Sequence, residues 1–131
     1  MAVIISHSIK RKEFKKGMTQ TDLQMILHGF QEGIFTLIKG ENLPKGSRLI
    51  KVFSTTVAGA RRIVFLVDVA GNDAFFLFYR SKKDKIGKNI SIQNQEFRKV
   101  LHKYLALLSA DIGSGALDAY NILPRKVALF T

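Results

Sequence analysis

The first apolar and basic positions of the chain predict a short strand followed by a short helix. Residues 3–6 are apolar up to a serine, which favours a strand. Residues 8–16 are rich in Lys and Arg, with Ile9 and Phe14 spaced as the apolar anchors of a two-turn helix. Gly17 follows directly and is predicted to end this helix.

A second, amphipathic helix is predicted to come next. Thr19 and Asp22 have the pattern of a helix N-cap with an acid three residues on. The apolar positions that then recur every three or four residues are Leu23, Ile26, Leu27, Phe30 and Ile34. Gly33 or the Gly40 region is expected to end the helix, and residues 40–47 predict a loop by their Gly, Pro and Asn content.

The middle of the chain has the pattern of an antiparallel meander. Residues 48–55, 61–68 and 74–80 predict three strands, because they are rich in Val, Ile, Phe and Tyr. Gly59 and Gly71 mark the turns between them. The last two strands are apolar on both faces, which predicts a sheet covered on both sides.

Strand alternation predicts which side chains of residues 74–80 share a face. One face would carry Phe76, Phe78 and Arg80, and the other Phe75, Leu77 and Tyr79. Tyr79 and Arg80 then diverge unless a bulge intervenes, so one site cannot be assumed to use both.

The chain is predicted to return to a helix over residues 94–109. Its apolar stripe consists of Phe97, Val100, Leu101, Tyr104, Leu105, Leu108 and Ile112. Beyond it, residues 122–123 and 127–130 are apolar and favour either a short strand or an interaction tail. The predicted order is β-α-α-β-β-β-α, which is an α+β fold, and the length predicts a single domain over residues 1–131.

Charge adds a preference for anionic partners. The chain has 21 Lys and Arg against 10 Asp and Glu, a net charge of +11, and favours phosphate-rich partners through counterion release. A basic protein that binds no nucleic acid is the alternative at this stage. The absence of cysteine excludes disulfides and thiolate catalysis. No signal-peptide pattern or apolar run of transmembrane length is found, so we expect a cytoplasmic protein without membrane contact.

Several kinds of catalytic chemistry find no support in the sequence. It contains no Gly-rich phosphate loop, nucleophile elbow or HExxH motif. The histidines and acids are scattered, which predicts no metal site and no cofactor. What remains is a set of basic residues and a tyrosine around the meander.

Such a set suits RNA, whose own 2′-OH can act as the nucleophile without a metal. The enzyme must then orient that hydroxyl, stabilise charge on the phosphate oxygens and move protons. The candidates are Lys51, Arg61, Arg62, Tyr79, Arg80, Lys82, Lys83, Lys85 and Lys88. A basic run after a strand is also what a solvated loop looks like, and that alternative stays open here.

Three segments together follow the pattern of a known family: KRKEFKKGMTQTDLQMILHGFQEGIF, LIKVFSTTVAGARRIVFLV and NDAFFLFYRSKKDKIGKNIS. They resemble the RelE/ParE superfamily of bacterial toxins, especially its RelE-like addiction-module branch. The first is similar to the family's basic helix and the start and close of its second helix. The second resembles its basic strand, Gly turn and arginine-led strand, and the third resembles the segment before its last helix. The loop around residues 86–87, the pair at 79–80 and the chain after residue 109 depart from the family pattern.

The resemblance implies a compact antiparallel sheet with flanking helices and an endoribonuclease that cuts mRNA on the ribosome. It also implies a cognate antitoxin that neutralises the basic face. By position it implies that Lys51, Arg62 and Lys82 are catalytic. Tyr79 is a further catalytic candidate by its residue type, at a place where the family has a small residue. The candidates for RNA binding are Arg61, Arg80, Lys83, Lys85 and Lys88.

Two alternatives from other classes remain. The same superfamily contains non-catalytic inhibitors of DNA gyrase, and a basic RNA-binding module without catalysis also fits the composition. Pairing of the predicted strands places Lys51 and Arg62 near each other and brings the chain at Lys82 back beside them. We therefore expect three segments to deliver cations to one end of the sheet.

Overall fold

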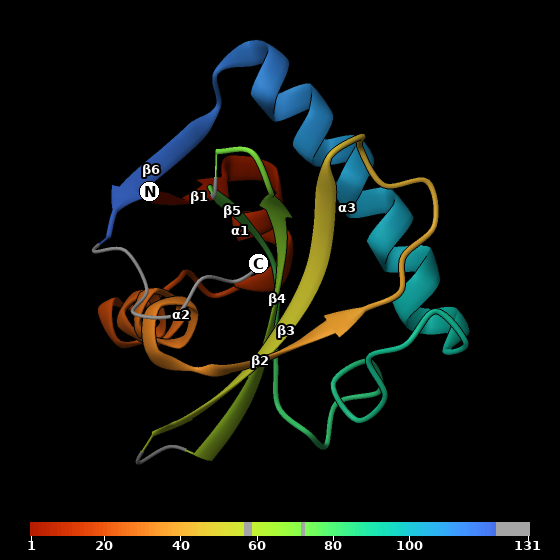
Figure 1. Cartoon of the computed structure of the whole chain (residues 1–131). Helices are drawn as coiled ribbons and strands as arrows, with labels where there is room; N and C mark the ends of the chain where they lie inside the picture. The colour runs from red at the N-terminus through yellow and green to blue at the C-terminus, as the bar shows by residue number, and fades with distance from the viewer. Residues whose placement is uncertain (57–58, 72, 123–131) are drawn as a thin grey trace.

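The described part of the chain forms one mixed sheet with helices on both faces, which confirms the α+β class. The computed structural model describes residues 1–56, 59–71 and 73–122. These residues form three helices and a six-stranded sheet of order β2-β3-β4-β5-β1-β6 (Figure 1). The strands are β1 (Ala2–Ser6), β2 (Ile34–Ile38), β3 (Ser47–Thr56), β4 (Gly59–Asp68), β5 (Ala74–Arg80) and β6 (Leu117–Asn121). The helices are α1 (His7–Glu13), α2 (Gln20–Glu32) and α3 (Gln95–Ser114).

The prediction missed two strands, and both are at the edges of the sheet. Ile34, assigned to the second helix by its spacing, begins β2 and pairs with Phe53 of β3. The helix ends at Glu32, and Gly33 is its C-cap. At the other edge, β6 pairs antiparallel with β1 along its whole length. The predicted strand or interaction tail at residues 122–123 and 127–130 lies outside the described residues, apart from Ile122.

Helix α1 is shorter than predicted and ends at Glu13 instead of residue 16. Phe14 leaves the helix and packs on the sheet, with its ring centroid 5.9 Å from Phe76 and 5.2 Å from Tyr79. Gly17 lies beyond the helix at a φ of +93°, where a residue without a Cβ is favoured. Tertiary packing of Phe14 therefore determines where this helix stops.

Helix α2 begins as predicted and packs closely on the sheet. Thr19 accepts a hydrogen bond from the backbone of Asp22, and the Asp22 carboxylate accepts one from the backbone of Thr19, which is a complete capping box. A Cβ at Gly29 would lie 3.2 Å from Ile63 Cδ1 and 3.4 Å from Val52 Cγ2. The glycine thus lets α2 approach β3 and β4 more closely than another residue would.

A β-bulge in β5 overturns the predicted alternation of this strand. Val64 pairs with Phe78 but Phe65 pairs with Phe76, so Leu77 is an extra residue on β5. Val64 and Phe65 are adjacent on β4 and point to opposite faces of the sheet. Their partners Phe78 and Phe76 therefore also point to opposite faces. Phe76 therefore shares its face with Tyr79, and Phe78 shares its face with Arg80. The prediction that Phe76 and Phe78 share a face was wrong, although Tyr79 and Arg80 still diverge.

Each face of the sheet consequently has its own aromatic cluster. On the face covered by α1 and α2, Phe65 lies 5.1 Å from Phe30 and 6.4 Å from Phe76 between ring centroids. On the face covered by α3, Phe78 lies 5.2 Å from Phe97 and 5.0 Å from Tyr104. Figure 1 shows α2 and α3 on opposite sides of the central strands. The sheet is therefore covered on both faces in its middle, as its apolar strands indicate.

A buried carboxylate joins α1, β5 and α3. The expectation of a wholly antiparallel sheet was wrong, because β1 pairs parallel with β5, at Val3 and Ile4. Helix α1 then continues along the same edge. The fully buried side chain of Glu13 accepts hydrogen bonds from the Tyr79 backbone N–H at 2.9 Å and the Tyr104 hydroxyl at 2.6 Å. It also pairs with Arg80 through Nε at 3.0 Å and Nη2 at 2.6 Å. The carboxylate of Glu13 thus accepts the hydrogen bond of the Tyr79 N–H that a neighbouring strand would otherwise accept.

We predict that Glu13→Ala lowers the free energy of unfolding by about 3–5 kcal/mol, because it leaves a half-buried guanidinium, a hydroxyl and a backbone donor without their acceptor. Urea unfolding followed by circular dichroism measures this loss. Glu41→Ala, which removes an exposed loop carboxylate, is the matched control and should change stability by less than about 0.5 kcal/mol. Equal stability of the two variants would contradict the assigned role of Glu13.

Candidate nucleic-acid interface

One row of side chains crosses four strands on the α3 face of the sheet. The pairing registers place Ile34 of β2 opposite Phe53, Phe53 opposite Arg62, and Arg62 opposite Arg80. Residues directly opposite each other in a sheet share a face. The row lies at the lower end of the sheet in Figure 1, where the β3–β4 hairpin ends and the chain leaves β5.

Phe53 is the centre of this row, and two cations lie against its ring. Lys51, two residues earlier on the same strand, has its Nζ 5.9 Å from the ring centroid. The guanidinium carbon of Arg62 lies 5.3 Å from the same centroid. Phe53 remains 42% exposed and its neighbour Ile34 81% exposed. The structure thus brings Lys51 and Arg62 together, around an aromatic side chain that was not among the predicted site residues.

The basic loop after β5 is held firmly beside this row. Arg62 donates a hydrogen bond from Nη1 to the carbonyl oxygen of Gly87, 25 residues later in the chain. Asp84 accepts hydrogen bonds from the backbone N–H groups of Ile86 and Gly87 at 2.9 and 3.0 Å. A Cβ at Gly87 would clash with the carbonyl oxygen of Ser81, so this turn requires glycine. These hydrogen bonds therefore order the backbone of the loop.

The lysine side chains of this loop face the solvent. Ile86 and Ile90 are buried beneath the loop, whereas its four lysines are exposed: Lys82, Lys83, Lys85 and Lys88. Among the described residues, no ion pair joins these lysines to a carboxylate. Their charges are consequently available to an anion in solution. No hydrogen bond or ion pair between described residues joins Lys82 to Lys51 or Arg62, and Lys82 lies on the loop that follows β5.

Arg80 has its charge compensated within the protein. Its guanidinium pairs with Glu13 at 2.6 Å and with Asp84 at 3.2 Å. Burial alone would lower the pKa of Arg80, but the hydrogen bonds and charge of Glu13, followed by the charge of Asp84, raise it above its ordinary value. For Asp84, burial opposes ionisation, yet the backbone hydrogen bonds and Arg80 lower its pKa. The main contribution of Arg80 is therefore to hold the loop, which allows Arg62 to lie opposite another arginine without a large repulsion.

Tyr79 and Arg61 lie on the other face of the sheet. The guanidinium carbon of Arg61 is 5.7 Å from the centroid of the Tyr79 ring, and this ring also packs on Phe14. Burial, together with the carboxylate of Asp22, raises the pKa of Tyr79 to about 12. The structure therefore separates Tyr79 from Lys51 and Arg62, and the tyrosine hydroxyl keeps its proton at neutral pH.

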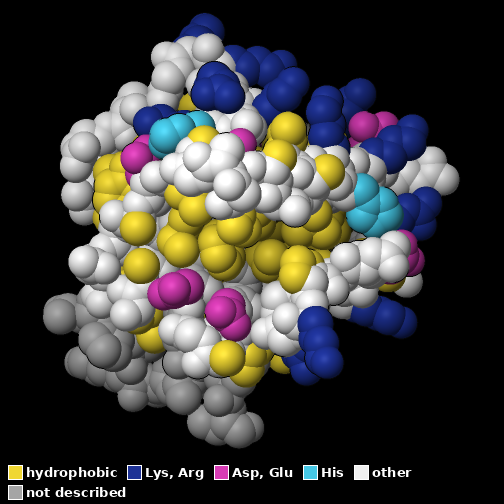
Figure 2. Space-filling model, turned by 90° about the horizontal axis from the view of Figure 1, so that it is seen from above, with side chains coloured by type: hydrophobic (Ala, Val, Ile, Leu, Met, Phe, Trp, Pro, Cys, Tyr) yellow, Lys and Arg dark blue, Asp and Glu magenta, His cyan; other side chains and the backbone are white. Residues whose placement is uncertain are grey.

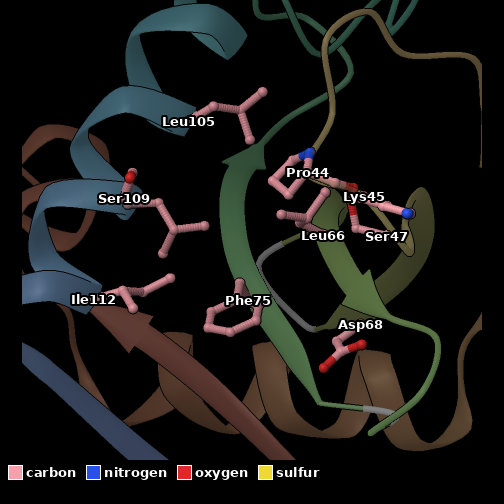
Figure 3. A pocket seen from close by; sticks show the side chains of 10 residues that line it. Pro44, Lys45, Ser47, Leu66, Asp68, Phe75, Leu105, Ser109 and Ile112 are labelled. Carbon is pink, nitrogen blue, oxygen red and sulfur yellow. Dashed lines mark hydrogen bonds between the residues drawn. The ribbon is translucent and has the colours of Figure 1, made fainter.

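A hollow of about 340 Å³ lies on the α3 face at the opposite end of the sheet. Figure 3 shows Leu105, Ser109 and Ile112 of α3 turned toward Phe75 and Leu66 of the strands, with Asp68 near one end. Hydrophobic side chains gather in a groove on this upper side of the molecule, and lysines and arginines gather elsewhere in the same view (Figure 2). Asp68 and Arg62 are six residues apart on β4, which separates the hollow from Phe53 by roughly 20 Å.

The described part of the chain has neither a metal-binding cluster nor a membrane-spanning helix. Residues 1–56, 59–71 and 73–122 contain no group of three or more His, Cys, Asp or Glu side chains that could hold a metal ion. None of the helices formed by these residues is long and apolar enough to cross a membrane.

Sequence reasoning missed Phe53, Glu13 and Asp84. Phe53 had a usable signal, since it follows Lys51 by two residues and so shares its strand face. Asp84 also had a local signal, because an Asp commonly accepts hydrogen bonds from backbone N–H groups two and three residues later, as it does here from Ile86 and Gly87. Glu13 had none, because its partners are 66, 67 and 91 residues away.

The chain matches no family model, no curated protein and no solved structure. The resemblance to the toxin superfamily therefore rests on the three sequence segments and stays a prediction.

The raised pKa of Tyr79 predicts how stability depends on alkaline pH. Because the folded pKa is about 12 and the ordinary value is 10.0, unfolded chains lose this proton first. The contribution of Tyr79 to stability is therefore complete below about pH 10 and is lost as the pH rises toward 12. Urea unfolding over this pH range should show a smaller loss for Tyr79→Phe than for the wild type. Tyr120→Phe, in β6, serves as the control, and identical pH dependences of wild type and Tyr79→Phe would refute the prediction.

Proposed function

We propose that the protein binds and cleaves RNA as a RelE-like toxin of a toxin–antitoxin pair. The single observation that carries the proposal is the half-exposed Phe53 ring between Lys51 and Arg62, beside a loop with four exposed lysines. Fixed cations around an aromatic ring suit a chain of phosphates and unpaired bases. The resemblance supplies the rest of the proposal: mRNA on the ribosome as substrate, and an antitoxin that covers the basic face.

The proposed chemistry needs no cofactor. The 2′-oxygen of the ribose attacks the adjacent phosphorus, the bond from phosphorus to the 5′-oxygen breaks, and a 2′,3′-cyclic phosphate and a 5′-hydroxyl result. One proton leaves the 2′-hydroxyl and another joins the 5′-oxygen. Lys51 and Arg62 stabilise the charge that gathers on the phosphate oxygens, and Lys82 approaches from the loop. Fixed donors of this kind are worth on the order of a hundredfold or more in rate each.

The fold is compatible with the proposal. The β3-β4-β5 meander carries the candidate residues, and the basic loop connects it to α3. The resemblance implies an antiparallel sheet with flanking helices, and this meander supports the proposal. In our proposal β2 and β6 are additions at the two edges of that core.

A non-catalytic RNA-binding module is the second candidate, and one observation favours it. Tyr79, the candidate with a hydroxyl that could move a proton, lies on the opposite face and holds its proton at neutral pH. Binding without cleavage is then the expected behaviour of the same surface.

Our catalytic prediction is that Arg62→Ala or Lys82→Ala abolishes mRNA cleavage and growth arrest after brief induction. Each change removes a donor to the transition-state phosphate, and mapping of RNA 5′ ends measures the cleavage. Arg62→Lys keeps the charge but not the planar fork, so it should restore cleavage only in part. Lys103→Ala, at an exposed position of α3, is the control and should cleave as the wild type does. Full cleavage and toxicity of both alanine variants would overturn this assignment.

A separate prediction concerns salt. Affinity for single-stranded RNA should fall steeply with salt, with each contacted phosphate adding roughly 0.7 to the log–log slope. Replacing Lys82, Lys83, Lys85 and Lys88 together by Gln should reduce that slope by up to about 3. Titrations by fluorescence anisotropy at several salt concentrations measure it. Replacing Lys45, Lys99 and Lys103 together by Gln is the control and should leave the slope unchanged. An unchanged slope for the loop variant would show that RNA contacts another surface.

A further inference from the structure

Phe53 and Ile34 form an exposed apolar pair in the most basic part of the sheet. They are cross-strand partners on β3 and β2, and they are 42% and 81% exposed. Single exposed apolar residues are common, but two in direct contact range with cations at their border indicate a contact surface. Neither packing nor strand pairing explains why the large apolar side chains at these two positions are exposed to solvent.

The surroundings of the pair favour an anion with flat apolar groups. Lys51 and Arg62 lie at the Phe53 ring. Next to them a hollow of about 230 Å³ is bordered by Lys39 and Lys51, and none of its lining residues is acidic. Single-stranded RNA joins phosphates to exposed planar bases, whereas a duplex hides its bases in the stack. An acidic protein has the charge but offers no planar group with a phosphate on either side.

The two cations can change partners when RNA arrives. A cation on an exposed aromatic ring gains only about 0.5–1 kcal/mol, and a phosphate gives Lys or Arg a charge-assisted hydrogen bond that is stronger. Movement of Lys51 and Arg62 to phosphates would free the ring face for a base. The resting contacts keep the ring and the cations in position until then.

We propose that Phe53, supported by Ile34, is a stacking platform for one unpaired base of the RNA. Lys51 and Arg62 bind the phosphate beside that base, which is the one cleaved in the proposed function. The neighbouring nucleotide enters the hollow between β2 and residues 90–93, where Thr36, Ser91 and Gln93 offer polar groups. Stacking accepts every base, so the platform selects single strands rather than one base identity. This inference rests on RNA being the ligand of the proposed site.

The test measures binding of an unstructured RNA oligonucleotide by the full-length protein, at several salt concentrations. Phe53→Leu should weaken binding about ten- to a hundredfold, the usual worth of one stacked base, and should leave the salt slope unchanged. Phe53→Trp should bind as well as the wild type, because it keeps an aromatic face. Ile112→Ala, which trims a 48%-exposed apolar side chain at the other end of the sheet, is the control and should have no effect.

The shortest oligonucleotide that binds with full affinity, made with one abasic site at each position in turn, gives the decisive comparison. An abasic site at one position should weaken RNA binding by the wild type by the same factor as Phe53→Leu does. The same abasic site should not weaken binding by the Phe53→Leu variant further, because the two changes remove the same contact. Wild-type affinity of Phe53→Leu, or equal losses for Phe53→Leu and Phe53→Trp, would overturn the platform.

The outcomes also separate this inference from the proposed function. Stacking without cleavage would leave the platform standing and reject the nuclease. Cleavage with no effect of Phe53→Leu on binding would reject the platform alone. If the wild type binds none of the RNAs, the apolar pair belongs to a protein partner and both proposals fail.

Discussion

The Glu13 carboxylate is the interaction on which the rest of the site depends. It is fully buried and has four hydrogen bonds, to the Tyr79 backbone, two nitrogens of Arg80 and the Tyr104 hydroxyl. A buried carboxylate is costly unless it is paired and its lone pairs are filled, and both conditions hold here. Because Arg80 also binds Asp84, and Asp84 holds the backbone at Gly87, the same charge fixes the basic loop. One acid thus orders a surface that is otherwise strongly cationic.

The bulge at Leu77 decides which residues can cooperate. Without it Phe76 and Phe78 would share a face, and one aromatic cluster would be overcrowded while the other lacked its centre. With it, Phe76 completes the cluster under α1 and α2, and Phe78 completes the one under α3. The functional consequence is that Tyr79 and Arg61 belong to one face, whereas Lys51, Phe53 and Arg62 belong to the other. Any chemistry at the Phe53 surface must proceed without the tyrosine.

Local signals predicted the elements whose cause is local. The capping pair at Thr19 and Asp22, the strand at 74–80 and the start of α3 after Asn94 all lie where their patterns place them. The misses have non-local causes. Ile34 fits the helical spacing, but pairing with Phe53 makes it a strand residue, and β6 is too polar to be recognised without its partner β1. The candidate cations were found by residue type. That the charge of Arg80 is compensated depends mainly on Glu13, which is 67 residues away, and sequence spacing gives no sign of that contact.

Arg62 links the exposed ring to the fold of the loop. Its guanidinium lies against Phe53 and donates to the carbonyl of Gly87, so one side chain contacts both the candidate binding surface and the turn that presents the lysines. A guanidinium has five N–H donors, and the bond to Gly87 uses one of them, which leaves others for a phosphate. The same side chain can therefore bind an anion without releasing the loop. Lysine at this position could supply charge but not both contacts in one plane, which is the physical reason an arginine suits the junction between the ring and the loop.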